Sequence, residues 1–344
     1  MMKNKKNLLA VLFLILALIL CSCSSGSSGL QDKADIIFRF YHSKAGDAKM
    51  LNDHYLLTTI NRSLYGIDIL TGKVKKYDIA ADWLDIIPSE GIVVYSNAQF
   101  ELGIARFDED SNLTDNEIIF SNAHKADYMI DPAIVKVDDK YYVSMTFVDG
   151  NLNNGDSSKE DGKYTIRFYE LTDLKSLTYI SDVVSAQRNL EDVKITYSGG
   201  RLYLLFEKEV LDMANSAIQL SVSEDMGNSW NAPVTLLDSV ADQEPSDFDK
   251  TADGWTLYYS SDIAAPGKTY NGASPYTASF DENLNLISKD VKIDLDSPVA
   301  GDDETKLKGG VLLYSVNTFG NEIFYVFSEN HLSDDNICVS KVIQ

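Results

Sequence analysis

Short stretches rich in tyrosine, valine, isoleucine, leucine and phenylalanine recur along the chain, separated by clusters of aspartate, asparagine, glycine and serine. Apolar runs of this kind, bounded by turn-forming residues, are typical of β-strands. The three- to four-residue spacing of amphipathic helices is almost absent. The pattern therefore predicts an all-β fold.

One unit recurs along the chain: an acid, a strand, a tight polar turn and an aromatic-rich strand. Its copies span residues 131–146, 191–206 and 244–259, with a fourth at 302–314 and weaker ones at 47–58 and 85–95. A second hairpin follows in each unit, as over residues 218–237. Four strands per unit of this size are typical of a β-propeller blade.

The number of units predicts six blades. Five blades are the main alternative because the first two units are short, and a β-sandwich with coincidental repeats is a second alternative. An extra strand over residues 36–41 is expected to pair with the last blade and close the ring. Closure matters because an open ring leaves strand edges exposed.

The N-terminal segment has the pattern of an export signal. Three lysines among the first six residues precede an apolar run over 8–20 that is too short to span a bilayer. The following Leu20-Cys-Ser-Cys23 resembles a lipobox, and Ser22 is the small residue wanted before an acylated Cys23. We therefore predict a lipoprotein signal peptide over 1–22, a Ser/Gly-rich tether over 23–33 and a propeller domain over 34–344. An ordinary secretory signal is the alternative.

The charge balance narrows the choice of partners. The chain carries 52 acidic against 30 basic residues, a net charge of −22. Such a surface repels nucleic acid and anionic lipid, which are excluded as partners. We expect a monomer that touches the cell membrane or outer membrane only through its lipid anchor, facing away from the cytoplasm.

Cysteine and histidine give no sign of a cofactor. After signal cleavage only Cys23 and Cys338 remain, so no disulfide is expected within the mature chain. The four histidines are scattered without metal-ligand spacing. The acids could hold a bound Ca²⁺, although no loop has EF-hand spacing.

The segment Ser223-Glu-Asp-Met-Gly-Asn-Ser-Trp230 resembles the Asp-box, a repeat of sialidase-like propellers. Asp225 can accept backbone N–H groups within the turn, Gly227 can take a positive φ, and Trp230 can be buried against the blade. The resemblance implies a structural turn between the third and fourth strands of a blade.

Sialidases resemble one another in holding the substrate carboxylate with three arginines, whose planar guanidinium groups pair well with carboxylates. Arg39 stands roughly where the first arginine of that family lies, but no arginine follows Arg201. Sialidase activity is therefore the less favoured interpretation. Arg39 is expected to be a surface residue of the closing strand.

A second resemblance concerns the acids. Asp131-Pro132, then a strand and Asp138-Asp-Lys-Tyr-Tyr142, is similar to units of five-bladed glycosidases, the arabinanase, xylosidase and fructosidase-like families of the family-43 type. The resemblance implies three catalytic carboxylates: Asp47 as base, Asp131 as the helper that orients the acid and tunes its pKa, and Glu191 as general acid. Ala48 and Asp192 depart from the proline and glycine expected after the base and the acid.

The fold would bring the acids of the repeat together. Strands that start near the axis of a propeller direct their first residues to one common mouth. The acids at these starts are Asp47, Asp85, Asp131, Glu191, Glu244 and Asp303. Crowded carboxylates raise one another's pKa values, which suits an acid/base pair. The alternative is that these acids bond to backbone amides at turns.

Aromatic residues accompany the long loops expected at the same mouth, over residues 148–162 and 262–275. Phe147, Tyr270 and Tyr276 are candidates for stacking on sugar faces. With Asp85, Glu244 and Asp303 they complete the predicted substrate-binding set.

Two functions of different class follow. The chain is either a surface glycosidase using Asp47, Asp131 and Glu191, or a non-catalytic propeller that binds glycan or a surface protein at the same mouth.

Overall fold

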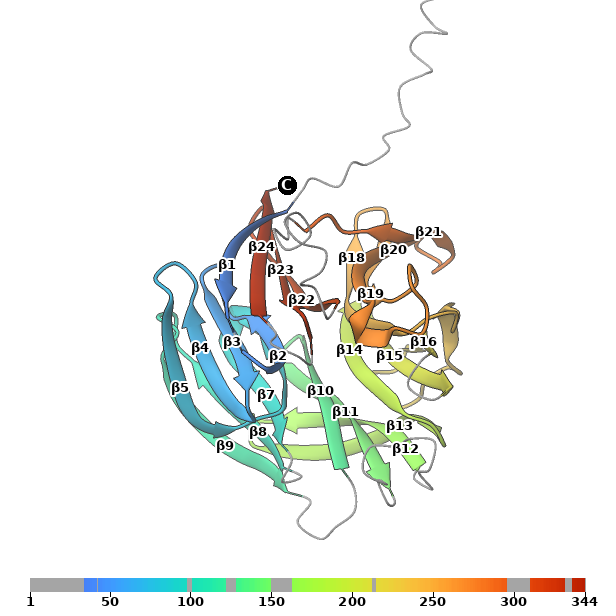
Figure 1. The fold of residues 1–344 in the computed structure, drawn as a ribbon. Helices are drawn as coiled ribbons and strands as arrows, with labels where there is room; N and C mark the ends of the chain where they lie inside the picture. The colour runs from blue at the N-terminus through green and yellow to red at the C-terminus, as the bar shows by residue number, and fades with distance from the viewer. Residues whose placement is uncertain are drawn as a thin grey trace, which may run out of the picture. The chain divides into compact units, whose positions relative to one another are not determined.

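The computed structural model describes residues 34–41, 43–97, 101–121, 128–149, 163–211, 215–295, 310–331 and 336–343. In these ranges the protein is a six-bladed β-propeller of four-stranded antiparallel sheets (Figure 1). The prediction of an all-β fold with six blades is confirmed, and the five-bladed alternative is wrong. The predicted signal peptide and tether, with Cys23, lie outside the described residues, as does Asp303.

The blades follow one another along the chain. Blade 1 comprises β2 (Ala45–Met50), β3 (Tyr55–Ile60), β4 (Ser63–Asp68) and β5 (Lys73–Ala80). Blade 2 comprises β6 (Trp83–Ile87), β7 (Ile92–Asn97), β8 (Glu101–Phe107) and β9 (Leu113–Ser121). Blade 3 comprises β10 (Tyr128–Val137), β11 (Lys140–Asp149), β12 (Lys163–Thr172) and β13 (Ser176–Ala186).

Blade 4 comprises β14 (Leu190–Ser198), β15 (Arg201–Leu211), β16 (Asn215–Ser223) and β17 (Val234–Leu237). Blade 5 comprises β18 (Gln243–Thr251), β19 (Gly254–Ser261), β20 (Ser274–Phe280) and β21 (Leu286–Lys292). Blade 6 comprises β22 (Val311–Phe319), β23 (Glu322–Glu329), β24 (Asn336–Ile343) and β1 (Asp35–Phe40). Short 3₁₀ turns lie at η1 (Pro88–Glu90) and η3 (Thr269–Asn271). Within the described ranges, no helix has the length and apolar character needed to cross a membrane.

The first strand of the chain closes the ring, as predicted. β1 pairs antiparallel with β24, so the two ends of the domain share one sheet, and Figure 1 shows blue β1 beside red β24. Arg39 fixes this pairing: its Nε and Nη2 donate to the two carboxylate oxygens of Glu329 at 3.1 and 2.8 Å. Because Glu329 is fully buried, this bidentate ion pair neutralises a carboxylate charge that water cannot reach. Arg39, whose side chain is 16% exposed, thus secures the closing strand, and the expectation that it is a surface residue is wrong.

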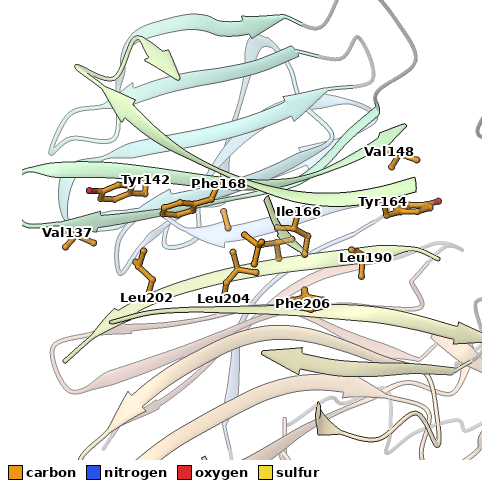
Figure 2. Packing of buried hydrophobic residues seen from close by; sticks show 13 residues of the cluster. Val137, Tyr142, Val148, Tyr164, Ile166, Phe168, Leu190, Leu202, Leu204 and Phe206 are labelled. Carbon is orange, nitrogen blue, oxygen red and sulfur yellow. The ribbon is translucent and has the colours of Figure 1, made fainter. Parts of the chain in front are cut away.

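The hydrophobic core lies between neighbouring blades, and strands buried on both faces build it. In β15, Leu204 and Phe206 face blade 3, where they join the cluster that contains Phe168 (Figure 2). Leu205 points the other way and packs in the cluster of Trp255 from blade 5. Alternating residues of one strand therefore hold two blade boundaries, which explains why the second strand of the repeat is apolar and aromatic at nearly every position.

The turn at Ser223–Trp230 joins β16 to β17, the third and fourth strands of blade 4, where the sequence placed it. Asp225 accepts the backbone N–H of Ser229 at 2.8 Å, and Gly227 has φ +83°. The Trp230 indole donates to Ser181 Oγ at 3.1 Å across the blade boundary. The turn therefore ties blade 4 to blade 3.

The innermost strand of each blade is its first strand, since β2, β6, β10, β14, β18 and β22 contact one another in turn around the ring. Aspartates in these strands accept a backbone N–H from the innermost strand of the next blade at 2.8–3.0 Å. The donor–acceptor pairs are Leu84 to Asp47, Ile134 to Asp85, Asp192 to Asp131 and Val316 to Asp247. Charge-assisted bonds of this kind lock adjacent blades at the axis.

Lys49 supplies positive charge to this ring of aspartates. Its side chain is 5% exposed and its Nζ lies 3.5 Å from Asp85 Oδ1. Burial alone would lower the pKa of Lys49, but the negative charges of Asp85, Asp47 and Asp247 outweigh burial and raise it. One lysine therefore serves carboxylates from three blades.

We predict that Lys49→Met lowers the free energy of unfolding by about 3 kcal/mol at pH 8, because three aspartates at the axis lose their counter-charge. The loss should shrink at pH 5. Without Lys49 the folded-state pKa values of Asp47 and Asp247 rise further, so the variant's stability is greatest when these two groups are protonated and falls as pH rises through those values.

Urea denaturation at both pH values measures the effect, with Lys73→Met, an exposed lysine of the same blade, as the matched control. An equal loss at pH 5 and pH 8, or no loss beyond that of the control, would contradict the predicted charge balance.

Candidate functional site

Four of the innermost strands bulge near their acids, whereas β6 pairs in regular register at Asp85. The pairing register shifts at Ala45/Asp47 in β2, at Ile130/Ala133 in β10, at Glu191/Lys194 in β14 and at Pro245/Asp247 in β18. Asp131 and Asp192 occupy equivalent bulge positions, with φ of 49° and 51°. Because a bulge redirects side chains out of the regular alternation, consecutive residues such as Glu191 and Asp192 can both serve the axis.

The three acids implied as catalytic share one electrostatic centre, although each comes from a different blade. Burial, then the charges of Asp192 and Asp47, together raise the pKa of Asp131 to about 7, against the opposing effects of a backbone hydrogen bond and of Lys194. Burial, then the charge of Asp131, raises the pKa of Glu191 well above its usual value. The pKa of Asp47 is also raised by burial, while Lys49 and Lys194 oppose the shift.

Hydrogen bonds orient two of these acids. Asn189 donates its side-chain amide to Glu191 Oε1. Asp47 accepts the backbone N–H of Ala48 at Oδ1, 2.8 Å away, and that of Leu84 at Oδ2, 3.0 Å away. The carboxylate of Asp47 is therefore held in one orientation, and each of its oxygens retains a lone pair for another partner.

The other predicted residues at the centre are Glu244 and Tyr270. The charge of Glu244, followed by burial, raises the pKa of Tyr270 well above its usual value, and Glu191 adds to the effect. The Tyr270 ring lies 4.8 Å from the ring of His331. Burial lowers the pKa of His331 to about 4, so this histidine is neutral at physiological pH.

Phe147 and Tyr276 lie in the core and not at the axial centre, so the prediction that they stack on sugars is wrong. Phe147 is 1% exposed and lies under Arg167, whose guanidinium carbon is 4.4 Å from its ring centroid. Tyr276 is 6% exposed and packs 5.9 Å from the ring of Tyr259. Their positions in β11 and β20 direct both rings into the core between blades, where no sugar can stack on them. Asp85 lies at the axis, bonded to Lys49 and to the next blade.

Several residues of the centre were missed from the sequence. Lys49 and Lys194 each follow an aspartate by two residues, in Asp47-x-Lys49 and Asp192-x-Lys194. An Asp-x-Lys pair at the start of an inner strand is a signal that could have identified them, because residues two apart face the same side of a strand. Glu207, 2% exposed in β15, is a charged residue directly after an apolar run, which is a second such signal.

The centre has two chemically different halves. Around Asp47, Asp85 and Asp247, lysines balance the negative charge. Around Glu191, Glu207 and Glu244, the strongest charges acting on each glutamate are other carboxylates. Acids whose protonated form is favoured by burial and by neighbouring carboxylates thus lie near acids for which lysines oppose the effect of burial, an arrangement suited to paired proton donation and acceptance.

Comparisons with known proteins give no sequence family: no family model and no curated protein matches the chain. The fold is similar to that of a thermostable family-43 glycoside hydrolase, with a TM-score of 0.51, 15% identity and coverage of 76% of this chain and 88% of the other. It is also similar to an α-L-arabinofuranosidase from Lactobacillus brevis, with a TM-score of 0.50, 13% identity and coverage of 75% and 89%.

A β-1,2-mannobiose phosphorylase from Listeria innocua aligns over 92% of both chains, with a TM-score of 0.49 and 13% identity. At these identities the likeness is one of fold. The chain therefore has a β-propeller fold similar to that of glycoside hydrolases.

Proposed function

We propose that the protein is a carbohydrate-active propeller that cleaves glycosidic bonds at the axial carboxylates. Glu191 is the general acid, Asp131 positions it and tunes its pKa, and Asp47 is the base. The observation that carries the proposal is that these acids, from blades 1, 3 and 4, interact electrostatically in one centre, as the charges of Asp47 on Asp131 and of Asp131 on Glu191 indicate.

The chemistry follows from the pKa directions. Burial and the charge of Asp131 keep Glu191 protonated, so it can donate a proton to the leaving-group oxygen of a glycoside. Burial raises the pKa of Asp47, and the charges of Lys49 and Lys194 oppose this rise and so assist the ionised state that a base requires. A sugar ring between these groups would meet a proton donor on one side and a carboxylate on the other.

A non-catalytic propeller that binds glycan or a surface protein at the same centre is the second candidate. It is favoured by the backbone bonds of Asp47, Asp85 and Asp131, each of which links its blade to the next. These bonds give the three acids a structural function that would keep them in place without turnover.

For the cellular setting, we propose a lipid anchor at Cys23 that holds the domain outside the cytoplasm, on the cell membrane or outer membrane. The support comes from the sequence: a basic start, a short apolar run, Ser22 before Cys23 and a Ser/Gly tether.

Glycoside cleavage is tested with chromogenic arabinosides, xylosides, fructosides, mannosides and sialosides. We expect turnover of at least one non-sialoside, and a fall of about 10²–10⁴-fold in kcat/KM for Glu191→Gln, since the variant keeps the shape but loses the proton. Glu224→Gln, an exposed glutamate of the same blade, is the control and should match the wild type.

Binding of glycan by calorimetry without turnover of any substrate would favour the second candidate. Unchanged turnover in Glu191→Gln would refute the assignment of the general acid.

Lipidation is tested by growing cells with an alkyne-tagged fatty acid. The wild type and Cys21→Ser should incorporate the tag, and Cys23→Ser should not, because only the thiol at the lipobox position is acylated. Labelling of Cys23→Ser, or no labelling of the wild type, would contradict the anchor.

A further inference from the structure

Three carboxylates on the boundary between blades 4 and 5 form a compact group. Asp192 of β14, Glu207 of β15 and Glu244 of β18 each place a carboxylate oxygen so that all three oxygens lie within 4.8 Å of one another. Asp192 and Glu244 are half-buried and Glu207 is buried. Three ionised acids this close repel one another strongly unless a proton or a cation lies between them.

One carboxylate oxygen of Glu207 lacks a partner within the described part of the chain. The side chain is 2% exposed, and its Oε2 receives no hydrogen bond from any described residue. Such an unsatisfied buried acceptor is costly, and a bound ion or water molecule is one way in which native structures satisfy it. The charges that act most strongly on Glu207 come from Asp192, Glu191 and Asp242, all of them negative.

The repeat explains why Asp192 is available. In the preceding blade Asp131, at the equivalent bulge position, accepts a backbone N–H from β14 at 2.8 Å. In β18 the residue after Glu244 is Pro245, which has no N–H to donate. Among the described residues, no backbone N–H of β18 bonds to the Asp192 carboxylate, which lies instead beside those of Glu207 and Glu244.

We propose that Asp192, Glu207 and Glu244 bind one Ca²⁺ ion that joins blade 4 to blade 5. Calcium takes oxygen ligands at about 2.3–2.6 Å, so it accommodates two ligands up to about 5 Å apart. Magnesium, at about 2.0–2.1 Å, spans only about 4 Å and demands regular octahedral geometry. The exposed portions of Asp192 and Glu244 give the ion a route from solvent, and water molecules complete its shell.

This inference goes beyond the proposed function and does not depend on it. Asp192 follows Glu191 in the sequence, but the residues that hold the ion are not the proposed catalytic acids. Binding of the ion is measured without a substrate. Loss of glycosidase activity would leave the cation site untouched, and an absent cation site would leave the three proposed catalytic acids in place.

The test is calorimetric titration of CaCl₂ into the purified full chain in detergent after EDTA treatment, with thermal unfolding measured alongside. We expect one Ca²⁺ per chain with a Kd of about 10⁻⁵–10⁻³ M, a rise in Tm with Ca²⁺, and binding of MgCl₂ at least about 10-fold weaker. Glu207→Gln should weaken Ca²⁺ binding at least about 10-fold and remove the rise in Tm.

Glu224→Gln is the matched control and should bind as the wild type does. Near-UV circular dichroism verifies that Glu207→Gln is folded, and Asp192→Asn repeats the test from a second strand. No saturable Ca²⁺ binding by the wild type up to about 10 mM, or wild-type affinity in both Glu207→Gln and Asp192→Asn, would overturn the proposal.

Discussion

Burial of many carboxylates around one axis is the constraint on which the rest of this structure depends. Ring closure by β1 and β24 leaves the six innermost strands no other arrangement than to face a common centre. Each acid there loses water, which disfavours its charge, and gains neighbours of like charge. The molecule meets this cost with backbone N–H donors from the next blade, with Lys49 and Lys194, and with acids held protonated.

The N–H donors, lysines and protonated acids are unevenly distributed around the axis. This uneven distribution suggests acid/base chemistry. Where the lysines act, their charges oppose the burial that raises the pKa of Asp47. Where Glu191, Glu207 and Glu244 meet, burial and mutual repulsion favour the proton. If all axial acids were neutralised in the same way, they would have only a structural role. A proton donor beside a proton acceptor can transfer protons to and from a bound molecule. Both the proposed glycosidase activity and the proposed cation site follow from this difference in charge between the two halves of the axis.

Much of the fold could be predicted from the sequence because the repeat combines strand, turn and acid at the same positions in each blade. One acid in each of β2, β6, β10, β14 and β18 was found in this way, and so was the closing strand, whereas Asp192 and Asp247 were not. The positions of the aromatic side chains were harder to predict. Phe147 and Tyr276 lie in strands buried on both faces, so alternation alone does not tell which neighbours a side chain meets. Glu207 was missed because it lies in the second strand, which the repeat presents as apolar.

The catalytic roles were inferred from five-bladed glycosidases, but this propeller has six blades. With six blades around the axis, a shared motif at Asp131 places the residue in an inner strand but does not fix its distance to partners one or two blades away. That is why the mutual influence of Asp47, Asp131 and Glu191 carries more weight than the motif.

The most direct measurement is a double-mutant cycle between Asp47→Asn in blade 1 and Lys194→Met in blade 4, on opposite sides of the ring. If charges from facing blades meet at the axis, urea denaturation of the two single variants and the double variant will give a coupling energy of about 1 kcal/mol or more at pH 7. Additive losses, with no coupling beyond experimental error, would contradict the shared centre.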